Sequence, residues 1–161
     1  MPRRLLREGR IVEDHWVYAA EGADDPAAPL IVPFEQWQAE RDRWLARSGP
    51  LGVILSPAHK VEQLARDLAR LTLVGSDFTG PSEGRGYTQA RQLREQYKFA
   101  GEVRATGYVH RDQLFFMARC GFNSFELRDG EAEDAWRALS TFSAAYQPSN
   151  DAGLPLKLQR R

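Results

Sequence analysis

Apolar and polar positions alternate along the first twenty residues with the period of two that is typical of β-strands. The stretch LLREGRIVEDHWVYAA (5–20) carries this alternation on both sides of Glu8–Gly9, a pair suited to a tight turn. We therefore predict an N-terminal β-hairpin. A small, polar, proline-containing loop, residues 21–29, follows it.

From residue 29 onward, short apolar runs alternate with longer stretches whose apolar residues recur at helical spacing. Strands are expected within residues 29–33, 49–57, 71–78, 101–109 and 123–129. Helices are expected within residues 34–47, 58–70, 84–99, 110–122 and 130–146. Because these segments alternate with short connections, they require crossovers and therefore a parallel sheet. The predicted fold class is α/β, with about five alternating βα units after the hairpin.

The order of the strands is open at this point. Neighbours in chain order would form part of a barrel, whereas a reversal would form a doubly wound sheet. In the fourth expected strand, Glu102, Arg104 and Thr106 share one face, and Glu126 and Arg128 share a face of the fifth. Charged side chains do not stay buried without partners. We therefore favour a partial (β/α) barrel whose concave face carries these charged residues.

The length of 161 residues suits one domain with a hydrophobic core. We expect a single α/β domain over residues 1–147 and a flexible C-terminal tail over residues 148–161. Lys and Arg number 22, and Asp and Glu also number 22, so no overall field selects nucleic acid or a membrane as partner. The basic start of the chain has no apolar run after it, and no segment reaches membrane-spanning length. A cytoplasmic protein is therefore expected.

The chain has one cysteine, Cys120, which excludes a disulfide within the chain and a thiolate metal cage. The three histidines lack the spacing of metal ligands, and the glycine patterns of nucleotide-binding loops are absent. We therefore predict no metal and no cofactor. Ser56 and Pro57 are interpreted as the start of a helix, with His59 in its first turn.

Candidate functional residues follow the expected strands, because ligands of parallel α/β sheets gather at the carboxyl ends of the strands. Together with the concave face, these positions give a candidate ligand-binding set: Asp77, Arg85, Tyr87, Arg104, Arg111, Asp112, Glu126 and Arg128. The arginines suit an oxyanion, since the planar guanidinium matches its geometry. Arg85 lies between Gly84 and Gly86, which indicates either a loop that contacts an anion or a turn that needs positive φ. No catalytic residue is assigned.

The central part of the chain carries a specific set of short motifs. They are GRGY (84–87), ARQLR (90–94), EVRATG (102–107), DQL (112–114) and RCGF (119–122). In these motifs the chain resembles an uncharacterised bacterial family, a domain of unknown function, with similarity from about Ile11 to Phe142. Members of that family are commonly described as probable oxidoreductases of assimilatory sulfite reduction, because their genes lie beside that of the sulfite reductase hemoprotein. The resemblance implies a cytoplasmic protein of sulfur assimilation and supplies no catalytic residues.

Two functions are compatible with these observations. The first is an accessory protein that acts with the sulfite reductase hemoprotein and has no catalysis of its own. Its contact surfaces would be the polar sheet face and the tail segment LPLKLQRR (154–161), and any electrons would come from a cofactor of the partner. The alternative is a small enzyme or carrier that holds sulfite or a phosphate ester with the arginines, with Asp77 or Glu126 as orienting carboxylate or base. The polar face would also suit a homodimer interface.

Overall fold

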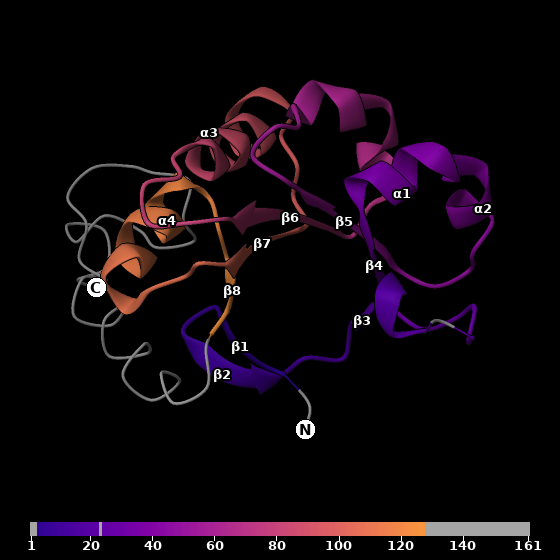
Figure 1. Ribbon diagram of the computed structural model, residues 1–161, viewed down its shortest axis with the longest axis horizontal. Coiled ribbons are helices and arrows are strands. Elements are labelled where there is room, and N and C mark those ends of the chain that lie inside the picture. The colour runs from indigo at the N-terminus through magenta and orange to yellow at the C-terminus, as the bar shows by residue number, and fades with distance from the viewer. Residues whose placement is uncertain (1–2, 23, 128–161) are drawn as a thin grey trace, which may run out of the picture.

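The computed structural model describes residues 3–22 and 24–127, and its centre is one curled, eight-stranded mixed sheet (Figure 1). The strands are β1 (Arg4–Arg7), β2 (Arg10–Glu13), β3 (Val17–Tyr18), β4 (Leu30–Pro33), β5 (Leu51–Leu55), β6 (Leu73–Phe78), β7 (Glu102–Gly107) and β8 (Ser124–Glu126). Their order in the sheet is β2-β1-β8-β7-β6-β5-β4-β3. Strands β3 to β8 are parallel neighbours in chain order, and β1 pairs antiparallel with both β2 and β8.

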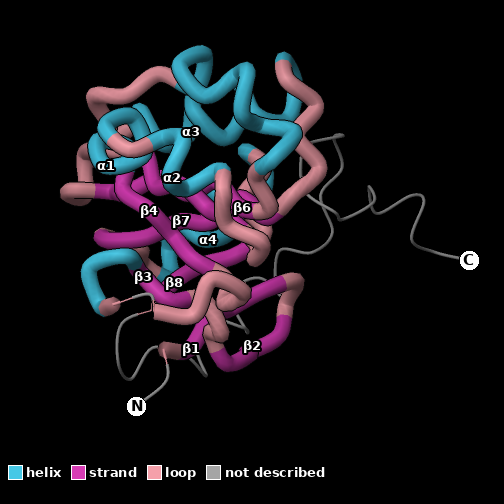
Figure 2. The backbone as a smooth tube through the Cα atoms, turned by 90° about the vertical axis from the view of Figure 1, so that its right-hand side faces the viewer, coloured by secondary structure: helices cyan, strands magenta, loops and turns pink. Residues whose placement is uncertain are grey.

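In Figure 2 most of the short helices lie above the strands, and the hairpin, which forms one edge of the sheet, lies at the bottom, away from them. The α-helices are α1 (Phe34–Ala39), α2 (Arg41–Leu45), α3 (Arg85–Arg91) and α4 (Leu114–Cys120). The 3-10 segments are η1 (Ala19–Glu21), η2 (Val61–Arg70) and η4 (Arg111–Gln113), and η3 (Gln92–Gln96) is a π-helical turn.

The strands from β3 to β8 follow one another in chain order and form a half-barrel, as we predicted from the charged residues on one face of two strands. The predicted make-up of the sheet, however, is wrong in two respects. The sheet has eight strands and is mixed, not a parallel sheet of about five βα units. The reason is that the hairpin joins the sheet through β8, and that β3 adds a further parallel edge beside β4. The expected helix over residues 130–146 and the expected tail over residues 148–161 lie outside the described residues.

The N-terminal hairpin is confirmed, and its turn explains the Glu8–Gly9 pair. Glu8 has φ 50° and Gly9 has φ 77°, which are the two positive values that a type I′ turn requires. The pairing of β1 with β8 then places Leu6 opposite Phe125, and both side chains are buried in the core.

The hydrophobic core lies between the sheet and the helices. Val53, Val74 and Val103 stand in register on three neighbouring strands, and all are fully buried. Phe34 and Trp37 of α1 belong to the same cluster of buried residues. Because side chains of a strand alternate between faces, the charged residues of β7 and β8 project from the opposite, concave face.

The segment expected as an α-helix over residues 58–70 is instead the 3-10 helix η2, which changes its inner face. With three residues per turn, Val61, Leu64 and Asp67 lie in one row, and these are its buried residues. Trp37 donates its indole N–H to Asp67 at 3.0 Å, and Arg41 donates its Nε–H at the same distance. Burial works against the charge of Asp67, but the hydrogen bonds from Arg41 and Trp37 outweigh it and hold the pKa of this carboxyl below its ordinary value.

Gly86 is required by a close approach of α3 to the sheet. A Cβ atom at this position would lie 2.5 Å from Cζ of Phe78 in β6, so only glycine lets the helix lie on that ring. The interpretation that a positive φ explains Gly84 or Gly86 is wrong, because Gly84 has φ −102° and Gly86 lies within α3.

Replacing Asp67 with alanine is expected to destabilise the protein. The change leaves the buried Trp37 N–H without an acceptor, which costs about 1–3 kcal/mol, and it removes the partner of Arg41. Chemical denaturation measures the loss. The control is Asp42→Ala, since the Asp42 side chain is fully exposed although it also approaches Arg41. Equal midpoints for the two variants would contradict the structural role of Asp67.

Candidate functional site: the charged concave face and the sites around it

Arg104 of β7 is the largest polar side chain that is fully buried in the described part of the chain, and it lies on the concave face. Its Nη1 and Nη2 atoms donate to the two carboxylate oxygens of Asp14 at 3.0 and 3.2 Å. Its Nε and Nη2 atoms donate to Oε1 of Glu102 at 3.1 and 2.9 Å. Four of the five N–H groups of the guanidinium therefore point at carboxylates of the chain itself.

Asp14 reaches Arg104 because the chain crosses the open side of the half-barrel at this point. Residues 14–16 join β2 to β3, which are the two opposite edges of the sheet. A link this short spans no more than about 14 Å between the flanking residues, so the curl brings the two edges close together. The backbone N–H of Trp16 also donates to Asp14 at 3.1 Å, which fixes the carboxylate on the linking segment.

Arg3 and Glu126 extend the cluster toward the edges of the sheet. Nε of Arg3 lies 3.3 Å from Oδ2 of Asp14 and 3.4 Å from Oε1 of Glu126. Tyr18 of β3 donates its hydroxyl to Glu126 of β8 at 2.8 Å, and the Arg3 guanidinium lies over the Tyr18 ring at 4.4 Å. We call Arg3, Asp14, Tyr18, Glu102, Arg104 and Glu126 the charged cluster.

The charged cluster shifts the pKa of its members in directions that follow from burial and charge. Burial opposes the charge on Arg104, but Glu102 and Asp14 outweigh it and hold its pKa above the ordinary value. Burial raises the pKa of Glu126, although the Tyr18 hydrogen bond and the arginines work in the other direction. Burial and then the charge of Glu126 raise the pKa of Tyr18. Arg104 is therefore a permanent cation, and Glu126 is the carboxyl of the cluster that holds its proton more tightly than usual.

The structure divides the predicted ligand-binding set between two regions. Arg104 and Glu126 lie in the charged cluster, and Asp77 on the same face accepts a hydrogen bond from Thr106 at 3.2 Å. The other described members lie among the helices, namely Arg85 and Tyr87 on α3 and Arg111 and Asp112 on η4. Arg128 lies outside the described residues. The seven described members therefore do not lie together in one region.

The sequence did not predict that Ser56, His59 and Glu35 lie in a row, with Ser56 hydrogen-bonded to His59 and His59 close to Glu35. The backbone N–H and the hydroxyl of Ser56 both lie 3.0 Å from Nδ1 of His59, and Nε2 of His59 lies 3.3 Å from Glu35. Because Nδ1 accepts the backbone N–H, the neutral ring carries its proton on Nε2, toward Glu35. The expected helix start at Ser56 is wrong, since η2 begins at Val61. The one signal for this contact in the sequence was that Ser56 directly follows an expected strand.

An aromatic pair lies between α3 and α4, with Tyr87 partly buried and Phe116 exposed. The rings of Tyr87 and Phe116 lie 5.0 Å apart, and half of the Phe116 surface is accessible. Phe116 is the one large hydrophobic residue among the described residues that is classed as exposed. The Arg119 guanidinium lies 5.7 Å from the neighbouring ring of Phe115. Cys120 at the end of α4 is fully buried, and burial raises the pKa of its thiol, so it has the setting of an unreactive cysteine.

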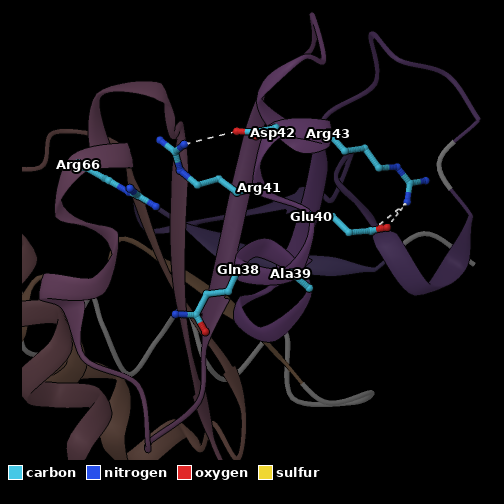
Figure 3. Close-up of a pocket in the computed structure, with 7 residues that line it drawn as sticks. All are labelled: Gln38, Ala39, Glu40, Arg41, Asp42, Arg43 and Arg66. Atoms are coloured by element: carbon cyan, nitrogen blue, oxygen red, sulfur yellow. Dashed lines mark hydrogen bonds and ion pairs between the residues drawn. The ribbon is translucent and has the colours of Figure 1, made fainter.

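Two hollows lie on the helix side of the molecule. One, of about 370 Å³, surrounds the junction of α1 and α2 (Figure 3). Its charges are largely paired within the chain, because Arg41 approaches Asp42 and Arg43 approaches Glu40. The other, of about 480 Å³, lies between the loop after β5 and the α3–η3 segment, and Arg85 is among its lining residues.

Over residues 3–22 and 24–127, the structure shows neither a helix able to cross a membrane nor a group of three side chains placed to hold a metal ion.

Replacing Arg104 with alanine is expected to lower the free energy of unfolding by about 3–5 kcal/mol, because Asp14 and Glu102 lose the cation that neutralises them. In a chain of this size the loss corresponds to a fall in Tm of roughly 10 °C. The control is Arg7→Ala, since Arg7 is half exposed and lies 3.7 Å from Glu102. A stable Arg104→Ala variant would show that Arg104 does not hold the fold together and would favour a ligand-binding role.

The raised pKa of Glu126 predicts a specific pH dependence. Above the ordinary value of 4.5 the unfolded chain releases this proton first, so the native state binds more protons and its stability falls as pH rises. The free energy of unfolding of the wild type relative to Glu126→Gln should therefore decrease from pH 4 to pH 7. Urea titrations at several pH values measure it, with Glu13→Gln at the exposed end of β2 as control. Parallel profiles for the wild type and Glu126→Gln would contradict the assignment.

Comparison with known proteins adds one result to this geometry. A search of curated proteins gives no significant match. A protein family described as "Bacterial protein of unknown function (DUF934)" matches residues 52–157. The matched region begins within β5 and extends past β8, including Arg85, Arg104 and Phe116, and the hairpin and Asp14 lie before it. Because the match spans more than half of the sequence, the chain belongs to this bacterial family of unknown function.

Proposed function

We propose that the protein is a cytoplasmic accessory protein of assimilatory sulfite reduction, which docks onto the sulfite reductase hemoprotein and performs no chemistry of its own. The motifs from GRGY (84–87) to RCGF (119–122) support this proposal through the family they resemble, whose genes lie beside that of the hemoprotein. The single cysteine supports it as well, because a dithiol redox centre needs a second thiol. Electrons would come from cofactors of the partner.

The observation that carries the docking role is the exposed ring of Phe116, which packs on the partly buried ring of Tyr87. Exposed aromatic rings are costly in water, and protein interfaces are enriched in aromatic residues and arginine. The pair lies between α3 and α4, and Arg119 lies one helical turn from Phe115 on α4. A hydrophobic centre with a basic neighbour is the composition expected of a binding hot spot.

The pairing of Arg104 favours docking over the alternative in which the arginines hold sulfite or a phosphate ester. An anion at Arg104 would have to displace Asp14 or Glu102, each of which forms two hydrogen bonds with the guanidinium. The displaced carboxylate would then lose its buried cation and keep only a partly exposed one, Arg3 beside Asp14 or Arg7 beside Glu102, which is unfavourable. The concave face therefore has the character of an internal ionic network.

Replacing Phe116 with serine is expected to weaken binding to the purified sulfite reductase hemoprotein by about tenfold or more, because a central aromatic side chain of an interface contributes on this scale. Biolayer interferometry with the full chain measures it. The control is Val12→Ser, which removes a partly buried apolar side chain of β2. Static light scattering of the protein alone shows whether the same pair instead mediates a homodimer.

A second experiment tests the docking role without assuming which surface of the protein makes the contact. The tagged protein is used to recover partners from lysate of the natural host during sulfate-limited growth, with and without residues 153–161. Recovery of the hemoprotein is expected, and its loss on deletion would place a contact in the tail. Failure of the wild type to recover the hemoprotein under crosslinking, together with no binding of the purified pair, would overturn the proposal.

A further inference from the structure

The groove between the loop after β5 and the α3–η3 segment has the position of a ligand site. It has a volume of about 480 Å³, and its lining residues include neither the charged cluster nor the aromatic pair. The loop follows the carboxyl end of β5, and α3 follows that of β6. Ligands of parallel α/β sheets collect at this edge, so the groove lies where the fold favours binding.

Gln89 of α3 holds the two walls of the groove together. It is almost fully buried, and its Nε2 donates to the carbonyl oxygens of Ser56 and His59 at 2.9 Å each. Both of its N–H groups are therefore used, and its Oε1 is left to accept a hydrogen bond. The Ser56 contacts and the Glu35 contact orient His59, which also lines the groove. The walls are thus fixed before a ligand binds.

The groove carries two cations that the described part of the chain does not neutralise. Lys60 and Arg85 line it, and neither side chain forms an ion pair within residues 3–22 and 24–127. This setting contrasts with that of Arg104, whose donors are occupied by carboxylates. Glu62 is the one acidic residue among the described lining residues. The excess of positive charge favours an anion.

A π-helical turn supplies the remaining polar wall. The N–H of Tyr97 bonds to the carbonyl of Gln92 at 3.1 Å, which is the spacing of five residues that defines such a turn. Isolated π turns are rare and occur frequently at functional sites. Gln92, Gln96 and Tyr97 all line the groove, so this irregularity lies beside it and places two amides and a phenol along its side.

We propose that this groove binds a small phosphate ester with a hydroxyl-bearing body. The phosphate lies against Arg85 and Lys60, because a guanidinium and an ammonium without internal partners are its natural ligands. The hydroxyl groups of the body donate to Oε1 of Gln89 and bond to the amides of Gln92 and Gln96, which offer both donors and acceptors. Binding here is independent of the docking proposed above, since Phe116 and Tyr87 lie outside the groove.

The probe is ribose 5-phosphate, with inorganic phosphate and glycerol as its two partial analogues. Titration of the isotope-labelled full chain, followed by amide NMR at low salt, should show ribose 5-phosphate shifting resonances of residues 57–62 and 85–97. The double variant Lys60→Gln/Arg85→Gln should weaken binding at least tenfold. The control is Arg10→Gln/Arg66→Gln, which has the same net charge and alters two exposed arginines outside the groove, and it should bind within twofold of the wild type.

A further variant separates recognition of the body from general attraction of anions. Gln96→Leu should weaken ribose 5-phosphate several-fold and leave inorganic phosphate unchanged, because it removes an amide and no charge. If the two double variants weakened the binding of ribose 5-phosphate equally, net charge alone would explain the effect, and the proposal would be overturned. Absence of saturable binding by ribose 5-phosphate, or shifts confined to residues outside the groove, would overturn it as well. None of these outcomes depends on the hemoprotein.

Discussion

The buried guanidinium of Arg104 is the constraint on which the curled sheet depends. A half-barrel of this size has an inner face, and barrels of parallel strands usually fill that face with layers of apolar side chains. Here the centre is a cation, and it must be neutralised at close range because the interior screens charge poorly. Asp14 provides part of this neutralisation from a segment that joins the two opposite edges of the sheet. The ion pair therefore fixes the curl as well as the charge.

The cluster around Arg104 contributes more to fixing the register of the strands than to the stability of the folded state. Buried ion pairs often add little net stability compared with apolar side chains of the same shape, whereas removal of one partner is severe. The contact between Tyr18 and Glu126 joins β3 to β8, which are far apart in sheet order, and the contact between Arg3 and Asp14 joins the ends of the neighbouring strands β1 and β2. A slip of one residue in β1 or β3 would break these contacts, because every side chain would change face. The ionic network thus selects one arrangement of the hairpin.

Much of the fold followed from the sequence because period-two and helical patterns are local. The hairpin turn at Glu8–Gly9, the five strands after residue 29 and the polar character of one face of β7 all depend on neighbouring residues. The short edge strand β3 and the antiparallel pairing of β1 with β8 depend on contacts across the fold, which no local pattern encodes. The 3-10 winding of η2 was missed for a similar reason, since Asp67 faces inward only because Trp37 and Arg41 are there to meet it.

The candidate site was predictable in its residue types but not in its grouping. Arg104 and Arg85 are the same type of residue in two settings. Arg104 lies within a strand on the concave face, and Arg85 lies directly after a loop. The strand position surrounds Arg104 with carboxylates of the chain, whereas the position at the start of α3 places Arg85 in a groove. Whether an arginine can serve a ligand is decided by its partners in three dimensions, and strand alternation identifies only the face on which to look for them.

The GRGY motif illustrates how closely different roles can lie on one short helix. Arg85 lines the groove, Gly86 permits α3 to lie on Phe78, and Tyr87 packs against both Phe78 and Phe116. The middle residue fixes the helix to the sheet, so its two neighbours are held in directions that differ by about 200° around the helix axis. Arg85 therefore belongs to the groove, and Tyr87 belongs to the aromatic pair with the exposed Phe116. A substitution at Gly86 would disturb both surfaces through a shift of α3, whereas substitutions at Arg85 and Tyr87 separate them.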